Sequence, residues 1–65
     1  MLNIQNIFTK RERDCLPYLA QGLTYKHIGK MLGLSHRTVE AYVKSMRVKI
    51  GAASKKELIQ KAIAH

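Results

Sequence analysis

Cysteine, acidic residues and long apolar runs are all scarce in this 65-residue chain. Its single cysteine, Cys15, cannot form an internal disulfide, so the fold does not depend on disulfide bonds and suits a reducing compartment. No apolar run approaches the ~20 residues that a membrane-spanning helix needs. The N-terminal segment MLNIQNIFTK lacks the charged start and the continuous apolar stretch of a signal peptide. These absences together predict a cytoplasmic protein.

Only 4 acidic residues stand against 12 lysines and arginines, which gives a net charge of +8 and a pI near 10.1. This imbalance predicts attraction to polyanions, with nucleic acid first and an anionic membrane second. The membrane is disfavoured because the apolar residues are needed for a core. Two further alternatives are an acidic protein partner and a basic surface that only keeps the chain soluble. A chain of 65 residues forms one small domain, in which a buried catalytic pocket is hard to fit.

Serine and threonine residues stand where helices are expected to begin. The caps are Thr9, Thr24, Ser35 and Ser54. Such residues accept a hydrogen bond from a backbone amide in the first helical turn. Glu12 and Glu57 follow the first and last caps at the spacing of a capping box. Glycines at 22, 33 and 51 mark three helix ends. This pattern predicts helices at about 10–20, 25–32, 36–50 and 55–63.

Each predicted helix has a single apolar stripe, which predicts an all-α fold, a compact four-helix bundle. The stripes comprise Cys15, Leu16, Leu19 and Ala20; Ile28, Met31 and Leu32; Val39, Val43, Met46 and Ile50; and Leu58, Ile59, Ala62 and Ile63. Residues 1–8 form a lead-in to a domain at 9–65, with Phe8 and Ile7 expected to be buried. Pro17 removes a helical hydrogen bond, at a typical cost of ~3 kcal/mol. Because the apolar stripe continues beyond Pro17, we expect a kink rather than a break.

The helices at 25–32 and 36–50 are joined by the short turn Gly33-Leu34-Ser35. Gly29 lies inside the first of them, where glycine costs ~1 kcal/mol relative to alanine. Its presence predicts a close approach of the following helix at that point. Residues 24–50 are therefore typical of a helix-turn-helix, whose second helix enters the major groove of DNA. The alternative is an ordinary helical hairpin.

Nearly the whole chain, residues 8–64, also resembles a known family. The segments TKRE (9–12), GLT (22–24), LGLS (32–35), TVE (38–40) and KIGAASKKEL (49–58) resemble the LuxR/GerE-type helix-turn-helix domain of bacterial transcription factors. The resemblance implies sequence-specific binding of double-stranded promoter DNA, usually by dimers paired through the fourth helix. RNA polymerase is a candidate further partner. Members often carry a separate regulatory domain, such as the receiver of a response regulator. The chain is either a stand-alone member or the DNA-binding part of a longer regulator.

The family's base-reading positions fall on Glu40, Ala41 and Lys44, opposite the apolar stripe of the predicted recognition helix at about 36–50. Lys44 suits the O6 and N7 acceptors of guanine, and Ala41 suits a thymine methyl group. Glu40 departs from the family, because relatives often have a basic residue there. It either accepts from the N4 amine of cytosine, or pairs with Lys44 or Arg37 and only orients them.

Exposed donors around the groove are predicted to contact DNA phosphates. They are Thr24, Tyr25 and Lys26; His36, Arg37 and Thr38; and Tyr42 and Lys49. The alternatives are capping for Thr24, a solvated face for Lys26 and Lys49, and partial core packing for Tyr42. In the fourth helix, Ile59, Ala62 and Ile63 are candidates for a homodimer contact; the alternative is that the whole stripe is internal core.

No catalytic or metal-binding constellation is visible in the sequence. His27, His36 and His65 do not share a helix face at i, i+4 spacing, and no carboxylate or thiol joins them. Cys15 lies on an apolar face, which predicts a buried core thiol rather than a nucleophile. The chain also lacks a Ser/His/Asp group and a glycine-rich phosphate cradle. We therefore expect neither an enzyme nor a bound cofactor.

Overall fold

The computed structural model describes residues 7–64 and confirms the all-α prediction. Its helices are α2 (Lys10–Ala20), α3 (Tyr25–Leu32), α4 (His36–Ile50) and α5 (Lys55–Ala64). They begin at the predicted residues, and no strand occurs between residues 7 and 64. Residues 1–6 of the predicted lead-in and His65 lie outside the described part of the chain.

The predicted caps form as local hydrogen bonds. At the start of α2, the Glu12 amide donates to the Thr9 hydroxyl at 3.2 Å, and the Thr9 amide donates to the Glu12 carboxylate at 2.7 Å. The hydroxyls of Thr24, Ser35 and Ser54 accept from amides at 3.2, 3.1 and 3.1 Å. Each cap is typically worth ~1 kcal/mol, a considerable part of a total stability of roughly 5 kcal/mol.

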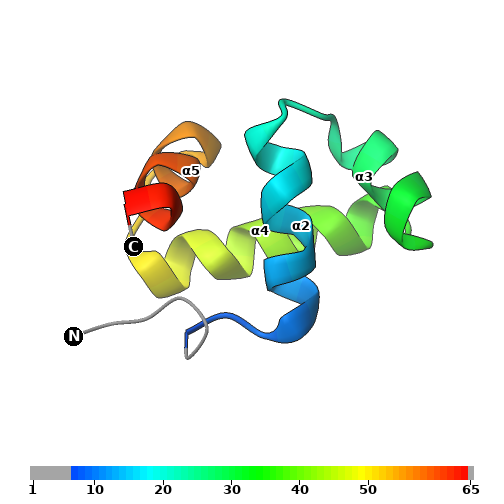
Figure 1. The fold of residues 1–65 in the computed structure, drawn as a ribbon. Helices are drawn as coiled ribbons and strands as arrows, with labels where there is room; N and C mark the ends of the chain where they lie inside the picture. Colours follow the sequence, from blue (N-terminus) through cyan, green and yellow to red (C-terminus); the bar gives the residue numbers. More distant parts are fainter. Residues whose placement is uncertain (1–6, 65) are drawn as a thin grey trace.

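Helix α4 is the element on which the other helices pack. In Figure 1 it runs across the molecule, α2 crosses its middle, and α3 and α5 lie toward its two ends. The core between them contains Cys15, Leu19, Ile28, Val39, Val43, Met46 and Leu58, each at most 1% exposed. Phe8 is also buried, as predicted, and Ile7 packs against the core.

Three residues of the predicted apolar stripes are exposed. Met31 is 55% exposed, Ala20 is exposed at the end of α2, and Ile63, for which a dimer contact was also considered, is 72% exposed. The short α3 buries the face that contains Ile28 and Gly29. At 3.6 residues per turn, Met31 is rotated roughly 100° from the centre of that face. The core predictions for Met31 and Ala20 are therefore wrong. An apolar residue at the edge of a stripe is buried only where a neighbouring helix packs against it.

Pro17 lies inside α2, and the helix continues through it to Ala20. The Gln21 amide donates to the Pro17 carbonyl at 3.2 Å, so hydrogen bonding resumes after the proline. This confirms that the helix is not broken. The buried residues Cys15 and Leu19 lie on either side of Pro17 in sequence, and their contacts hold both halves against the core.

The turn between α3 and α4 is fixed by its backbone. Gly33 has a φ of 71°, in the left-handed region that glycine adopts without strain. The Leu34 amide donates to the Gly29 carbonyl at 2.8 Å. A Cβ atom at Gly29 would lie only 2.4 Å from the Leu34 carbonyl oxygen. The close neighbour of Gly29 is thus the backbone of the turn, which corrects the expectation that it would be the following helix itself.

Candidate nucleic-acid interface

Helix α4 presents two different faces. Val39, Val43 and Met46 are buried against the other helices. Glu40, Ala41 and Lys44 are exposed on the remaining surface. The predicted base-reading residues thus share one accessible side of a helix whose other side is held by the core. This is the arrangement that a groove-reading helix requires.

Glu40 makes no ion pair with Lys44 or Arg37, although all three belong to the described residues. The internal pairing considered from the sequence is therefore not formed in the free domain. Glu40 instead lies close enough to Tyr25 to influence its phenol. Burial raises the pKa of Tyr25, and the charge of Glu40 raises it further while Arg47 acts in the opposite direction.

The start of α3 collects polar and basic side chains. Thr24, Lys26, His27 and Lys30 line a shallow depression of about 330 Å³. The Thr24 hydroxyl accepts from the His27 amide, so its capping role is confirmed. Amides in the first turn of a helix favour an anion. His27 and Lys30 were not predicted as contacts, although the i, i+4 spacing of Lys26 and Lys30 could have indicated Lys30.

Tyr25 joins the starts of α3 and α5 through a contact that the sequence reading missed. The ammonium of Lys55 lies 4.9 Å from the centre of the Tyr25 ring. Arg47 lies near the same site and donates from Nη2 to the Ala53 carbonyl at 2.7 Å, while its buried Nε has no hydrogen-bond partner. Lys55 and Arg47 therefore add positive charge beside a predicted phosphate contact. No local spacing rule relates residues 25 and 55.

The start of α4 remains accessible. His36 and Arg37 are exposed, and Thr38 is half-buried with its hydroxyl 2.9 Å from that of Ser35. Tyr42 is half-buried and packs against the core, as its alternative assignment predicted. These residues surround the Glu40–Lys44 face on the same helix.

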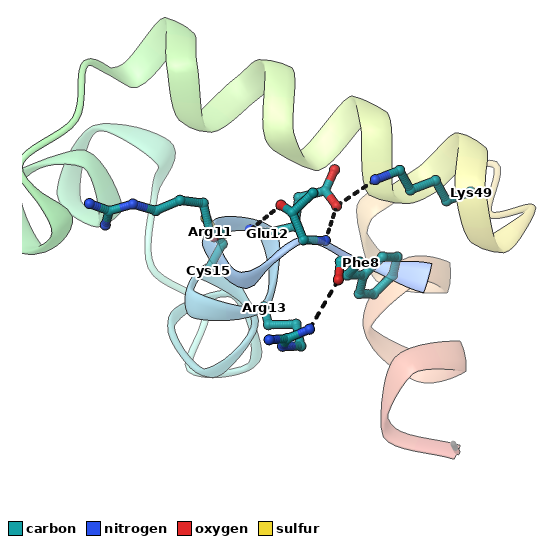
Figure 2. A network of polar contacts seen from close by, with 7 residues as sticks. Phe8, Arg11, Glu12, Arg13, Cys15 and Lys49 are labelled. Atoms are coloured by element: carbon teal, nitrogen blue, oxygen red, sulfur yellow. Dashed lines mark hydrogen bonds and ion pairs between the residues drawn. The ribbon is translucent and has the colours of Figure 1, made fainter. Parts of the chain in front are cut away.

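Lys49 is engaged within the protein. Its ammonium lies 2.7 Å from the Glu12 carboxylate, and its side chain is 34% exposed (Figure 2). Glu12 is a charged residue with only 3% exposure. Removing the partner of a buried charge is costly, so the ion pair with Glu12 restrains the Lys49 ammonium. The predicted phosphate contact of Lys49 competes with this ion pair and stays a prediction.

The environment of Glu12 sets its protonation. Burial raises the pKa of Glu12, but hydrogen bonds from Lys49, the Thr9 amide and Ser45 outweigh burial and hold the pKa below its ordinary value of 4.5. A carboxyl group with a lowered pKa in the folded state stabilises the fold above its unfolded pKa. That contribution is lost as the pH falls through the folded pKa.

We expect Glu12→Gln to flatten the acid dependence of stability. The wild-type domain should lose stability as the pH falls below 4.5, whereas the amide cannot take up that proton. Urea unfolding at a series of pH values between about 3 and 7 measures the difference. Glu57→Gln is the control, because Glu57 pairs with Lys61 at 3.2 Å at the surface, where a pair contributes little. Parallel acid limbs for wild type and Glu12→Gln would contradict the prediction.

Helix α5 divides the predicted dimer residues. Ile63 is 72% exposed, Ile59 is half-buried and Ala62 is only 6% exposed. Ala62 therefore belongs to the core, and the accessible part of the predicted contact is Ile63 with the outer part of Ile59. These residues border an apolar groove of about 360 Å³ between α2 and α5. Its lining is Arg13, Leu16, Pro17, Ala20, Ile59, Ala62 and Ile63.

Cys15 is fully buried, and its thiol donates to the Arg11 carbonyl at 3.5 Å. Burial raises the pKa of the Cys15 thiol, and the nearby carboxylates of Asp14 and Glu12 raise it further. Because the thiolate is the nucleophile, a raised pKa suits a core residue. Within residues 7–64, no group of three or more potential ligands is placed to hold a metal ion. No helix in this range is long and apolar enough to cross a membrane.

The short helix α3, a tight glycine turn, the longer helix α4 with one exposed face, and the net charge of +8 define a helix-turn-helix domain of the DNA-binding class. The chain belongs to the luxR family of bacterial regulatory proteins, whose family model matches residues 6–62. A comparison with solved structures finds no match.

Several relatives are regulators with names that state their roles. The chain is 36% identical over 58 residues to the transcriptional activator protein LuxR of Aliivibrio fischeri, covering 89% of the chain and 23% of that protein. It is 38% identical over 58 residues to the transcriptional activator protein SolR of Ralstonia solanacearum, covering 89% and 25%. It is 40% identical over 57 residues to the oxygen regulatory protein NreC of Staphylococcus aureus, covering 88% and 26%. The chain thus spans about a quarter of the length of these relatives.

Proposed function

We propose that this domain binds double-stranded promoter DNA in a sequence-specific manner and regulates transcription in the bacterial cytoplasm. The exposed face of α4 carries the proposal, since Glu40, Ala41 and Lys44 stand together on a helix fixed by the Gly33 turn. In this proposal α4 lies in the major groove. Lys44 reads guanine, Ala41 contacts a thymine methyl group, and the unpaired Glu40 accepts from cytosine.

The DNA backbone is held on both sides of that groove. At the start of α3, the contacts are made by Thr24, Tyr25 and Lys26. At the start of α4, they are made by His36, Arg37 and Thr38, with Tyr42 on its flank. The support is that Lys26, His36 and Arg37 are exposed and that the first turns of both helices favour an anion. Such contacts fix the register of a protein on the duplex without reading sequence.

Salt dependence tests this function. Sequences bound by the domain are first selected from a random duplex pool, and binding is then titrated by fluorescence anisotropy against a scrambled duplex. The two cationic phosphate contacts, Lys26 and Arg37, give a slope of roughly −1.8 in a double-logarithmic plot against salt. Affinity should then fall about 12-fold between 50 and 200 mM salt on that slope. Absence of duplex binding at low salt would refute the function.

Two copies of the domain pair through α5 in this proposal, with Ile63 at the centre of the contact. A two-fold contact places the same small patch of each copy against the other. It is weak in isolation and strengthened when both copies occupy adjacent half-sites. We further propose that the domain acts within a longer protein that carries a regulatory domain, because the relatives are about four times as long. Contact with RNA polymerase is the last part of the proposed role.

We expect Ile63→Lys to weaken binding to a duplex with two half-sites while leaving a single half-site unaffected. The substitution places like charges across the two-fold contact, and Ile63 is 72% exposed, so the fold should be retained. Linked binding events are typically strengthened by roughly 100-fold or more, and the loss should approach that gain. Anisotropy with one-site and two-site duplexes measures it. Gln60→Lys, on the exposed surface of the same helix, is the control. Equal losses on both duplexes for Ile63→Lys would contradict pairing through α5.

A further inference from the structure

Glu12 and Lys49 join two helices that are far apart in sequence. Glu12 lies in the first turn of α2, and Lys49 lies in the last turn of α4, 37 residues later. The same oxygen, Glu12 Oε1, accepts from the Thr9 amide at 2.7 Å and from the Lys49 ammonium at 2.7 Å. In Figure 2, dashed lines join the Glu12 carboxylate to the backbone at the start of its own helix and to the Lys49 ammonium. The carboxylate is therefore held from both directions.

This pair differs in kind from the apolar contacts around it. Val43 and Met46 hold α4 against the core through contacts that have no preferred direction. A hydrogen-bonded ion pair is directional and short, so it resists sliding and rotation of α4 over α2. Buried ion pairs contribute little net stability compared with apolar residues, and their best-supported use is to specify one arrangement.

The pair also lies close to the base-reading face. Lys49 follows Lys44 by five positions, which at 1.5 Å per residue is roughly 7.5 Å along the helix axis. A small rotation of α4 at Lys49 therefore moves the Lys44 side chain relative to a base edge. Hydrogen bonds to bases tolerate little displacement. A change in the pose of α4 therefore alters sequence specificity, although the net charge of the protein stays the same.

We propose that Glu12 and Lys49 are positioning residues for DNA recognition, which set the pose of α4 so that its exposed face meets the bases. The inference rests on the proposed function and assigns Lys49 to specificity, not to phosphate binding. Lys49 then contributes to the difference between specific and random DNA while making no contact with DNA itself.

Two properties distinguish a positioning residue from a phosphate contact: the specificity ratio and the salt slope. Lys49→Met keeps the length of the side chain and removes its charge. We expect it to lower the ratio of selected to scrambled affinity by about 10-fold, the size of one lost base preference, with an unchanged salt slope. Lys26→Met is the matched control, for which we expect similar losses on both duplexes and a slope smaller by about one.

Two further variants separate positioning from a failure to fold. In the double variant Glu12→Gln and Lys49→Met, no buried charge lacks a partner, so folding should be retained in circular dichroism while specificity stays reduced. Lys49→Arg keeps a cationic donor and should recover most of the specificity ratio. Hydrogen exchange in the absence of DNA should be faster in the last turns of α4 for Lys49→Met.

A salt slope smaller by about one with an unchanged specificity ratio would overturn the proposal and make Lys49 a phosphate contact. An unchanged ratio in the folded double variant would also overturn it, leaving the pair a purely structural role. Failure of the wild-type domain to bind any duplex is a different result, because it refutes the proposed function and is seen before any variant is made.

Discussion

Lys44→Ala is expected to weaken binding to the selected duplex by ~1–3 kcal/mol, or roughly 5- to 150-fold, with a much smaller loss on scrambled DNA. Lys44 is exposed on α4 beside Ala41 and Glu40, so its removal leaves the core intact. A donor that reads a base contributes only where the correct base is present. Anisotropy titrations on both duplexes at fixed salt measure the two losses separately.

Lys26→Ala is the control for that experiment. Lys26 is exposed at the start of α3, where phosphate contact is proposed. Its removal should weaken both duplexes alike and reduce the salt slope by about one. Equal losses on both duplexes for Lys44→Ala would remove the base-reading role of Lys44 and leave it a phosphate contact.

Gly29→Ala is expected to destabilise the domain by about 2 kcal/mol net, which moves its unfolding to a lower urea concentration. The new Cβ would lie 2.4 Å from the Leu34 carbonyl oxygen, which is backbone and cannot swing aside. Alanine recovers ~1 kcal/mol of helix propensity, but overpacking against rigid backbone should cost ~3 kcal/mol, the upper end of the typical range. The net loss is a large fraction of a total stability of ~5 kcal/mol.

Urea unfolding followed by circular dichroism tests Gly29→Ala, with Lys30→Ala as the matched control. Lys30 is the exposed neighbour of Gly29 on the same helix, and its substitution should change stability by less than about 0.5 kcal/mol. A stabilised Gly29→Ala variant would show that the α3–α4 turn adjusts freely. The geometry attributed to this turn would then be wrong.

Features set by near neighbours in sequence could be predicted well. The caps at Thr9, Thr24, Ser35 and Ser54 each bond an amide three residues ahead, so the sequence contains both partners. The exposed Glu40–Lys44 face follows in the same way from the period of one helix. The family resemblance seen in the sequence agrees with the family model, which matches residues 6–62.

Features that depend on packing between helices could not be predicted. The Glu12–Lys49 bond joins residues 37 apart, and the sequence alone made Lys49 another exposed cation. The contact between Lys55 and Tyr25 depends in the same way on how the first residues of α5 and α3 are brought together. Met31 and Ala62 show the same limit, since one apolar residue is uncovered and the other is enclosed. Which stripe residues are covered is decided by neighbouring helices and not by the stripe itself.

The burial of Cys15 has a practical consequence for studying the domain. A thiol that is 0% exposed and has a raised pKa reacts slowly with maleimides and similar reagents at neutral pH. A cysteine introduced at Met31, which is 55% exposed, would therefore be labelled selectively without removing the native thiol. The folded domain thus protects its own cysteine and accepts a single fluorophore at a chosen surface position.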